Sequence, residues 1–231
     1  MRNYLLLFII GLTTTLQAQM MLPTYQAVQY KNSGIVLPSV TIGTQIWMTK
    51  NLDVTTYRDG TPIPQVTDQT VWSGLTTGAW CYSNNDPANG LIYGKLYNWY
   101  AVAGIHDNDP NTPNKTLAPL GYHIPTDGEW TTLANYLGGD GLAGGKLKES
   151  GFTHWNSPNT GATNSSGFTG LPAGNRLSNK FDEFGLAVYF WSSTSYTTNL
   201  IYYLQLHYGW NSTYRSSYYK LAGFSVRCVK D

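Results

Sequence analysis

The feature that most constrains this fold is a nearly uncharged, strand-like stretch close to the end of the chain, residues 189–219. It carries one formal charge, Arg215, among Tyr, Ser, Thr, Asn and a few aliphatic residues. Aromatic and β-branched residues suit a pleated, half-buried sheet. The pattern therefore predicts strands at 189–193 and 201–208, followed by a hairpin or loop at 209–220.

The same stretch also has the composition of a contact surface. Tyr brings a large contact area with only two side-chain torsions to fix, and Ser and Asn bring adaptable hydrogen bonds. Two interpretations stand side by side: a Tyr-rich sheet with no special role, or an outward face that binds a ligand. The second interpretation predicts nine contact residues: Tyr196, Tyr203, His207, Trp210, Asn211, Tyr214, Arg215, Tyr218 and Tyr219.

The composition indicates a single extracellular domain. Charged residues make up 12% of the 231 residues, against about 25% in an average soluble protein. The formal net charge of +1 offers no basic stripe for nucleic acid. The aromatic share of 14% is too high for a disordered chain. We therefore expect one domain over residues 39–231 and no nucleic-acid partner.

The N-terminus has the features of a secretory signal peptide over residues 1–18. Arg2 supplies the positive charge, residues 5–12 supply the apolar run, and Ala18 ends a cleavage site. An uncleaved anchor is the alternative, but the apolar run is short for a membrane span. Residues 19–38 then form a linker, and no later apolar run could cross a bilayer. The sequence thus predicts a secreted or surface-exposed protein whose mature chain does not span the membrane.

The chain has two cysteines, Cys81 and Cys228. In an exported protein an even pair predicts one disulfide, here between an early strand and the last strand, 224–229. The chain-entropy model assigns so long a closed loop a stabilisation of about 4–5 kcal/mol. Two buried free thiols are the alternative interpretation.

The clearest helix signal starts at Thr126. Thr126 and Glu129 form a capping box, and Gly138 stands where a helix would end. The expected buried stripe is Trp130, Leu133, Ala134 and Leu137.

Three weaker patterns predict further elements. Residues 40–48 alternate around a Gly-Thr break and predict a hairpin. The spacing of aromatic residues favours a helix over 93–102, and the glycines of 138–145 favour a flexible crossing.

Six short motifs follow one another along the chain. They are YGKLYNWY (93–100), GYHIPTDGEW (121–130), AGGKLKE (143–149), TNSSGFTGLPAGNR (163–176), WSS (191–193) and GFSVRCVKD (223–231). Together they resemble the Fibrobacter succinogenes major paralogous domain over about residues 38–231. The HIPTDGEW and GFSVRCV pieces are also similar to landmarks of the formylglycine-generating sulfatase-modifying family.

The resemblance implies an α+β, C-type-lectin-like fold: a twisted antiparallel sheet with two flanking helices, long irregular loops, and paired N- and C-terminal strands. Similar domains often carry a Cys before the GYH run, and residues 116–120 of this chain have none. In some secreted bacterial and phage proteins of this kind, the C-terminal strands form a ligand-binding region rewritten by a diversity-generating retroelement. Residues 196–219 resemble such a region. Because members that are not diversified are also rich in Tyr and Ser here, both interpretations stay open.

No motif for catalysis or metal binding is present in the sequence. It contains neither HExxH nor G-x-S-x-G, and Glu129 is explained by helix capping. The acidic segments 107–111 and 84–86 offer oxygen ligands for calcium but are interpreted as turns. The histidines are scattered without ligand spacing: His106, His123, His154 and His207. We therefore expect no enzyme activity, no metal and no cofactor.

The sequence thus favours a secreted or surface-displayed binding module that recognises a protein or a glycan and is monomeric. Two alternatives come from other classes of protein. The first is an enzyme diverged from the formylglycine-generating type, although that family relies on a cysteine pair and this chain has only Cys228 in the corresponding half. The second is a structural subunit whose linker, 19–38, adds a strand to a neighbour.

Overall fold

The computed structural model describes residues 37–231, so the predicted signal peptide (1–18) and nearly all of the predicted linker (19–38) lie outside the described residues. The helices within this range are α2 (Gln69–Ser73), α3 (Pro87–Tyr93), α4 (Trp99–Val102), α5 (Asp127–Tyr136) and α6 (Asp140–Leu147), with a 3-10 turn at Ser83–Asn85. The strands are β1 (Ser39–Ile42), β2 (Gln45–Met48), β3 (Trp80–Cys81), β4 (Leu96–Tyr97), β5 (Tyr122–His123), β6 (Asn175–Arg176), β7 (Phe181–Asp182), β8 (Ala187–Ser195), β9 (Leu200–His207), β10 (Thr213–Tyr219) and β11 (Val229–Lys230). Helices and antiparallel sheets occur together, which confirms the predicted α+β class. None of the helices described here has the length and apolar character needed to cross a bilayer.

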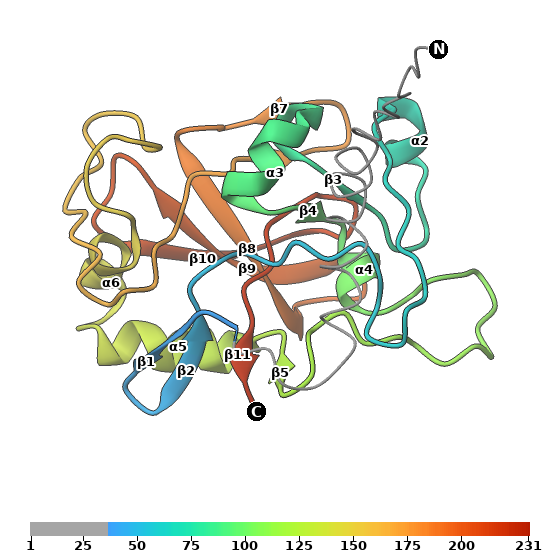
Figure 1. Cartoon of the computed structure of the whole chain (residues 1–231), viewed down its shortest axis with the longest axis horizontal. Helices are drawn as coiled ribbons and strands as arrows, with labels where there is room; N and C mark the ends of the chain where they lie inside the picture. The colour runs from blue at the N-terminus through green and yellow to red at the C-terminus, as the bar shows by residue number, and fades with distance from the viewer. Residues whose placement is uncertain (1–36) are drawn as a thin grey trace, which may run out of the picture.

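The Tyr-rich stretch forms an antiparallel sheet of three strands in the order β10–β9–β8. The strands predicted at 189–193 and 201–208 are parts of β8 and β9, and the segment 209–220 supplies β10. In Figure 1 this sheet runs through the middle of the molecule, and α5 and α6 lie toward one side of it. The sheet is therefore the frame on which the rest of the described chain is packed.

A second sheet has the strand order β1–β2–β11–β5. Val229 of β11 pairs with Trp47 of β2 on one side and with His123 of β5 on the other. The expected pairing of the N- and C-terminal strands is thus confirmed. The predicted hairpin at 40–48 is also confirmed, because β1 and β2 pair around Gly43, whose φ of +63° suits glycine.

Side chains that alternate along β8 and β9 divide the hydrophobic core into two parts. Phe190 and Leu204 point to the face that we call the helix face, where Phe190 stacks on Trp130 of α5 with ring centroids 5.6 Å apart. Trp191 and Tyr203 point to the opposite face, which we call the tyrosine face. Each large side chain that is fully buried in this way contributes about 1.5–3 kcal/mol to folding.

Helix α5 begins where the capping box predicted. The Thr126 hydroxyl accepts a hydrogen bond from the Glu129 amide (3.2 Å), and a Glu129 carboxylate oxygen accepts one from the Thr126 amide (2.8 Å). Gly138 follows the helix with a φ of +101°. The predicted buried stripe is buried in full: Trp130, Leu133, Ala134 and Leu137.

The structure corrects two of the weaker predictions. The predicted helix at 93–102 is instead the end of α3, strand β4 and the short helix α4. Gly94 interrupts the backbone with a φ of +72°, and the Asn98 side chain caps a new helix by accepting from the Ala101 amide. The predicted flexible crossing at 138–145 is largely helix α6. Gly144 and Gly145 suit this helix because the backbone of Ser212 and of Gly161 packs directly against them.

The predicted disulfide is not formed. Cys81 and Cys228 are both free and buried, and they lie in different parts of the core. Burial raises the pKa of Cys81 to about 11 and that of Cys228 to about 12. Both thiols therefore behave as small apolar core residues, which is the alternative interpretation of the pair.

The last motif, GFSVRCVKD, is buried on both sides rather than alternating as a simple edge strand. Only Val229–Lys230 forms a ladder, and the guanidinium of Arg227 is enclosed in the core. Arg227 Nη1 donates to the carbonyls of Met48 (2.9 Å) and Phe168 (2.6 Å). One buried cation thus joins the C-terminal segment to residues far away in the sequence.

Candidate functional site

The structure separates the nine predicted contact residues by exposure. The exposed ones are Tyr219 (62%), Tyr196 (58%), Tyr214 (48%) and Trp210 (43%). His207, Asn211, Arg215 and Tyr218 are half-buried, and Tyr203 is buried at 8%. The stretch therefore serves both interpretations, because part of it is core and part of it is surface.

Three of these residues form one aromatic cluster at the β9–β10 turn. The rings of His207 and Trp210 have centroids 4.2 Å apart, and those of Trp210 and Tyr214 have centroids 6.2 Å apart. We call His207, Trp210 and Tyr214 the turn cluster. Exposed aromatic side chains that support one another in this way are the residue types that dominate binding energy at interfaces.

A buried lysine holds the turn that carries this cluster. The Lys148 ammonium donates to the carbonyls of Trp210 (2.8 Å), Thr160 (2.9 Å) and His207 (3.0 Å). Burial lowers the pKa of Lys148 to about 8. These hydrogen bonds fix the backbone on both sides of the turn, so Trp210 is presented from a rigid base.

Asn211 supports the turn. Its carbonyl accepts from the Gly145 amide (2.9 Å), and its side-chain oxygen would lie 2.1 Å from a Cβ at Gly145 and 2.2 Å from one at Gly161. The absence of side chains at both glycines makes room for Asn211. Asn211 therefore has a structural role at the turn, and its role as a contact residue stays a prediction.

The Arg215 side chain also contacts other parts of the domain. Its guanidinium forms ion pairs with Asp140 of α6 (3.4 Å) and Asp127 of α5 (3.5 Å) and donates to the Thr131 hydroxyl. The one formal charge of the Tyr-rich stretch thus joins β10 to the two helices on the helix face. Its role as a contact residue stays a prediction.

Tyr203 is buried on the tyrosine face, where it helps to line a cavity of about 120 Å³. We call this space the tyrosine cavity. Its lining residues are Asn175, Leu177, Asp182, Glu183, Tyr189, Tyr203, Tyr218 and Phe224. Tyr203 therefore forms a wall of the cavity rather than an exposed contact, while Tyr218 stands half-buried beside it.

The polar side of the tyrosine cavity is a short hydrogen-bonded chain. The Tyr189 hydroxyl donates to Glu183 Oε2 (2.5 Å), and Gln205 Nε2 donates to that hydroxyl (2.8 Å). Burial, together with the Glu183 carboxylate, raises the pKa of Tyr189 well above its usual range. Since Gln205 lies opposite Tyr214 in the β9–β10 register, the cavity and the turn cluster are neighbours on one face of the sheet.

Tyr196 and Tyr219 belong to the other end of the sheet. Tyr219 pairs with Leu200 at the start of β9, and Tyr196 packs on Tyr202 with ring centroids 5.2 Å apart. From Thr213 to Tyr219 the strand rises about 20 Å at 3.4 Å per residue. Tyr196 is therefore remote from the turn cluster, whereas Tyr219 contacts Tyr218, a wall of the tyrosine cavity, with ring centroids 5.8 Å apart.

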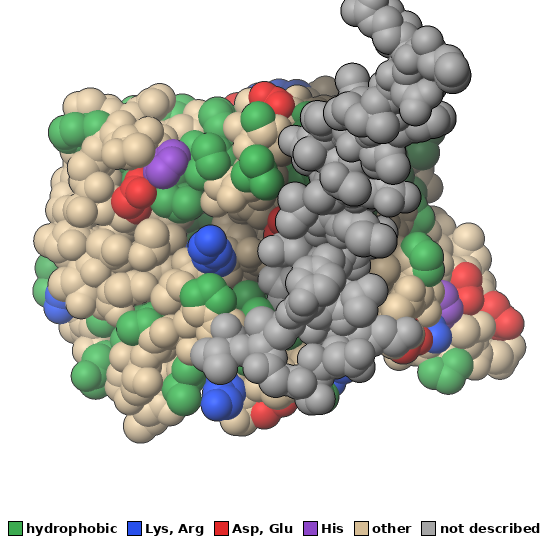
Figure 2. All heavy atoms as spheres, viewed as in Figure 1, with side chains coloured by type: hydrophobic (Ala, Val, Ile, Leu, Met, Phe, Trp, Pro, Cys, Tyr) green, Lys and Arg blue, Asp and Glu red, His purple; other side chains and the backbone are tan. Residues whose placement is uncertain are grey.

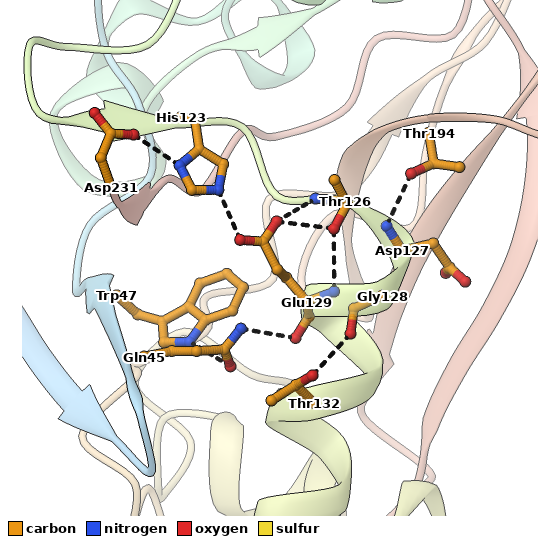
Figure 3. Close-up of polar contacts among 10 residues, drawn as sticks. All are labelled: Gln45, Trp47, His123, Thr126, Asp127, Gly128, Glu129, Thr132, Thr194 and Asp231. Atoms are coloured by element: carbon orange, nitrogen blue, oxygen red, sulfur yellow. Dashed lines mark hydrogen bonds and ion pairs between the residues drawn. The ribbon is translucent and has the colours of Figure 1, made fainter.

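A second polar cluster surrounds His123, which sequence reasoning treated as a surface residue. Figure 3 shows its ring between two carboxylates, with Nε2 2.7 Å from Glu129 Oε1 and Nδ1 2.8 Å from Asp231 Oδ1. Burial opposes the charged ring, but the bonds to Asp231 and Glu129 outweigh it and raise the pKa of His123. The cluster joins Asp231 to the start of α5.

The acidic segments act as turns, as expected. In the loop that follows α4, the Asp109 amide donates to Asp107 and the Asn111 amide donates to Asp109. Asp86 caps α3 through the Ala88 amide. Over residues 37–231 no group of three or more His, Cys, Asp or Glu side chains is arranged to hold a metal ion.

Sequence reasoning missed the residues that build the tyrosine cavity from outside the Tyr-rich stretch. Asn175 and Glu183 lie in β6 and directly after β7, in a region without regular periodicity. Glu183 adopts a φ of +56°, which no local pattern indicates. Lys148 was visible only as part of a motif, and nothing in its spacing shows that it is buried.

The comparisons with known proteins identify the family. No curated protein matches the chain, and no solved structure matches it. Residues 40–230 match the model of the Fibrobacter succinogenes major domain. This match covers nearly all of the described residues, and the chain belongs to the Fibrobacter succinogenes major domain family.

Proposed function

We propose that this protein is a secreted or surface-displayed recognition module that binds a macromolecular ligand through the turn cluster and the adjoining tyrosine cavity. The observation that supports the proposal most is the pairing of exposed Trp210 and Tyr214 with a cavity on the same face of the sheet. Aromatic anchors beside a concave, partly apolar surface are typical of binding sites.

The scaffold is rigid where the proposed site is placed. Lys148 holds the backbone of the turn, and Arg215 ties β10 to α5 and α6. A contact surface that is ordered before binding loses less conformational entropy on association. On the coloured part of the face seen in Figure 2, charged side chains are few and scattered. The turn cluster itself consists of aromatic side chains, which favours recognition by aromatic and hydroxyl groups over recognition by charge alone.

The scaffold that we propose is C-type-lectin-like. Support comes from β11, which pairs with β2 at the opposite end of the chain, and from α5 and α6, which flank the three-stranded sheet. Long irregular segments such as 148–174 connect these elements. The same arrangement limits the diversification hypothesis for residues 196–219, because Leu204, Leu206 and Thr213 are buried there.

The enzyme alternative requires a reactive cysteine beside histidine or metal. Cys228 is buried instead, and burial raises the pKa of its thiol to about 12. A thiol in this state supplies very little thiolate near neutral pH. The structure therefore favours recognition over the cysteine chemistry of the formylglycine-generating type.

A binding screen against glycans and surface proteins tests the proposal. The wild-type domain is compared with a Trp210→Ala, Tyr214→Ala double variant, and with a Tyr196→Ala variant as the control. We expect the first variant to lose its ligands and the control to keep them, since Tyr196 packs on Tyr202, away from the turn cluster and the cavity. Equal loss in both variants would contradict the proposed site, and so would full retention by the first variant.

A further inference from the structure

The tyrosine cavity is small and has a definite size. Its volume is about 120 Å³, which is below the volume of about 150 Å³ of an apolar cavity that holds a benzene molecule. A terminal amine with its last methylene groups is narrower than a ring. The cavity therefore suits the end of a flexible side chain.

One carboxylate oxygen of the cavity lining receives no hydrogen bond from the described residues. The hydrogen bonds to the Glu183 carboxylate from Tyr189 and Gln205 both end on Oε2, so Oε1 accepts none from the described residues. A ligand that supplies N–H donors is favoured at such an acceptor.

The charge balance around the cavity is negative. Asp182 is neutralised by an ion pair with Lys180, whose ammonium lies 2.6 Å from the carboxylate. Glu183 forms no ion pair within 4.0 Å in the described part of the chain, and its carboxylate accepts there from the Tyr189 hydroxyl and the Gln205 amide. The two carboxylates of the lining thus stand against one neighbouring ammonium, that of Lys180.

The remaining walls are aromatic rings. Tyr189 stacks on Phe224 with centroids 4.9 Å apart, and Tyr203 meets Phe224 edge-on at 5.4 Å. Tyr218 closes the group, with its centroid 6.0 Å from that of Phe224. Electron-rich rings of this kind attract a cation that lies over their faces.

We propose that the tyrosine cavity binds a primary ammonium group, namely the side chain of a lysine on a protein partner. The inference rests on the proposed recognition function and names the group that enters the cavity. A lysine ammonium carries three N–H donors, which match the Glu183 carboxylate, whose Oε1 accepts no hydrogen bond from the described residues. A quaternary ammonium would satisfy the aromatic walls but has no N–H donor for Glu183.

Nuclear magnetic resonance with labelled tyrosine rings tests this assignment on the described domain. The probes are Nα-acetyl-lysine methylamide, the same compound acetylated at Nε, and tetramethylammonium. We expect the first probe to shift the resonances of Tyr189, Tyr203 and Tyr218 in a saturable manner. Because acetylation removes the charge, the second probe leaves these resonances unshifted. Because tetramethylammonium has no N–H donor, it binds about tenfold more weakly than the lysine probe.

Variants connect the signal to the cavity. Glu183→Gln preserves the shape of the side chain. It is expected to lower the affinity for the lysine probe by about tenfold, because a charge-assisted hydrogen bond is lost. Asp59→Asn makes the same chemical change in an exposed turn and leaves the affinity unchanged. Tyr218→Ala weakens binding and Tyr218→Phe preserves it, which gives a second test that does not depend on the folding of the Glu183 variant.

The outcomes separate this inference from the proposed function. If the lysine probe leaves the tyrosine resonances unmoved while a ligand from the screen still binds through Trp210, the ammonium assignment is wrong and the proposed function stands. Equal binding of the lysine probe and its acetylated form also overturns the assignment. If the probe binds as expected and no macromolecule does, the cavity assignment holds and the proposed function is wrong.

Discussion

At the residue scale, buried cations hold this charge-poor chain together by binding backbone carbonyls. Arg227 donates to the carbonyls of Met48 and Phe168. Lys148 donates to the carbonyls of His207 and Trp210, on the two sides of the β9–β10 turn. Each hydrogen bond to a charged donor contributes about 1.5–3 kcal/mol. The sequence shows these residues only as isolated Lys and Arg, because their partners are backbone atoms that leave no pattern in the sequence.

The two cysteines give a direct prediction. Because both thiols are buried and their pKa values are raised, a thiol reagent applied to the native protein at pH 7.5 will modify neither Cys81 nor Cys228. The same reagent will modify both after unfolding in guanidinium without a reductant. A Ser193→Cys variant, exposed on β8, is the positive control. Thiols that become reactive only after reduction would show that a disulfide exists after all.

His123 gives a prediction about pH. Its pKa is raised in the folded state, so its contribution to stability is present below about pH 6.5, the unfolded value, and is lost as the pH rises through the folded pKa. The ring is partly exposed, so we expect His123→Gln to lower the free energy of unfolding by about 0.5–1 kcal/mol at pH 6 and by less at pH 9. Urea unfolding at both pH values measures the difference.

If His123→Gln lowers the free energy of unfolding by the same amount at both pH values, the ring acts through packing rather than through charge. His106→Gln, in the loop that follows α4, is the control for changes in histidine content.

At the element scale, the sequence predicted the elements that carry their own local signals. Helix α5 has a capping box and a complete apolar stripe, and the β1–β2 hairpin has a turn glycine, so both were found. Helix α6 has neither signal. Its stability comes from packing against β10 and the β9–β10 turn, which only the tertiary structure reveals.

Two glycines of α6 provide a matched test. A Cβ at Gly145 would lie 2.1 Å from the Asn211 side-chain oxygen and 2.2 Å from the Gly161 carbonyl oxygen, whereas a Cβ at Gly141 meets nothing within 4 Å. We expect Gly145→Ala to destabilise the domain by about 1–3 kcal/mol. Gly141→Ala should stabilise it by about 0.5–1 kcal/mol through helix propensity.

Chemical unfolding of the two variants measures this difference directly. Similar effects of the two changes on the free energy of unfolding would contradict the close approach of the β9–β10 turn to α6.

At the scale of the whole molecule, composition located the contact stretch but not its division into core and surface. Strand alternation places Tyr203 and Tyr214 on the same face of the sheet. Tyr203 is nevertheless buried and Tyr214 exposed, because neighbouring segments cover only part of that face. Asn175 and Glu183 come from the loops around β6 and β7, far from the Tyr-rich stretch in sequence. Their approach depends on long-range packing, which a single sequence does not encode as a readable pattern.

The central claim is that ligands are bound at the turn cluster and the adjoining tyrosine cavity and not around Tyr196. The most direct measurement is the dissociation constant of one ligand selected by the wild-type domain, compared across three single variants. Trp210→Ala and Tyr214→Ala are each predicted to raise that constant by about tenfold or more, and Tyr196→Ala by less than about twofold. A larger loss of affinity from Tyr196→Ala than from Trp210→Ala and Tyr214→Ala would contradict the account.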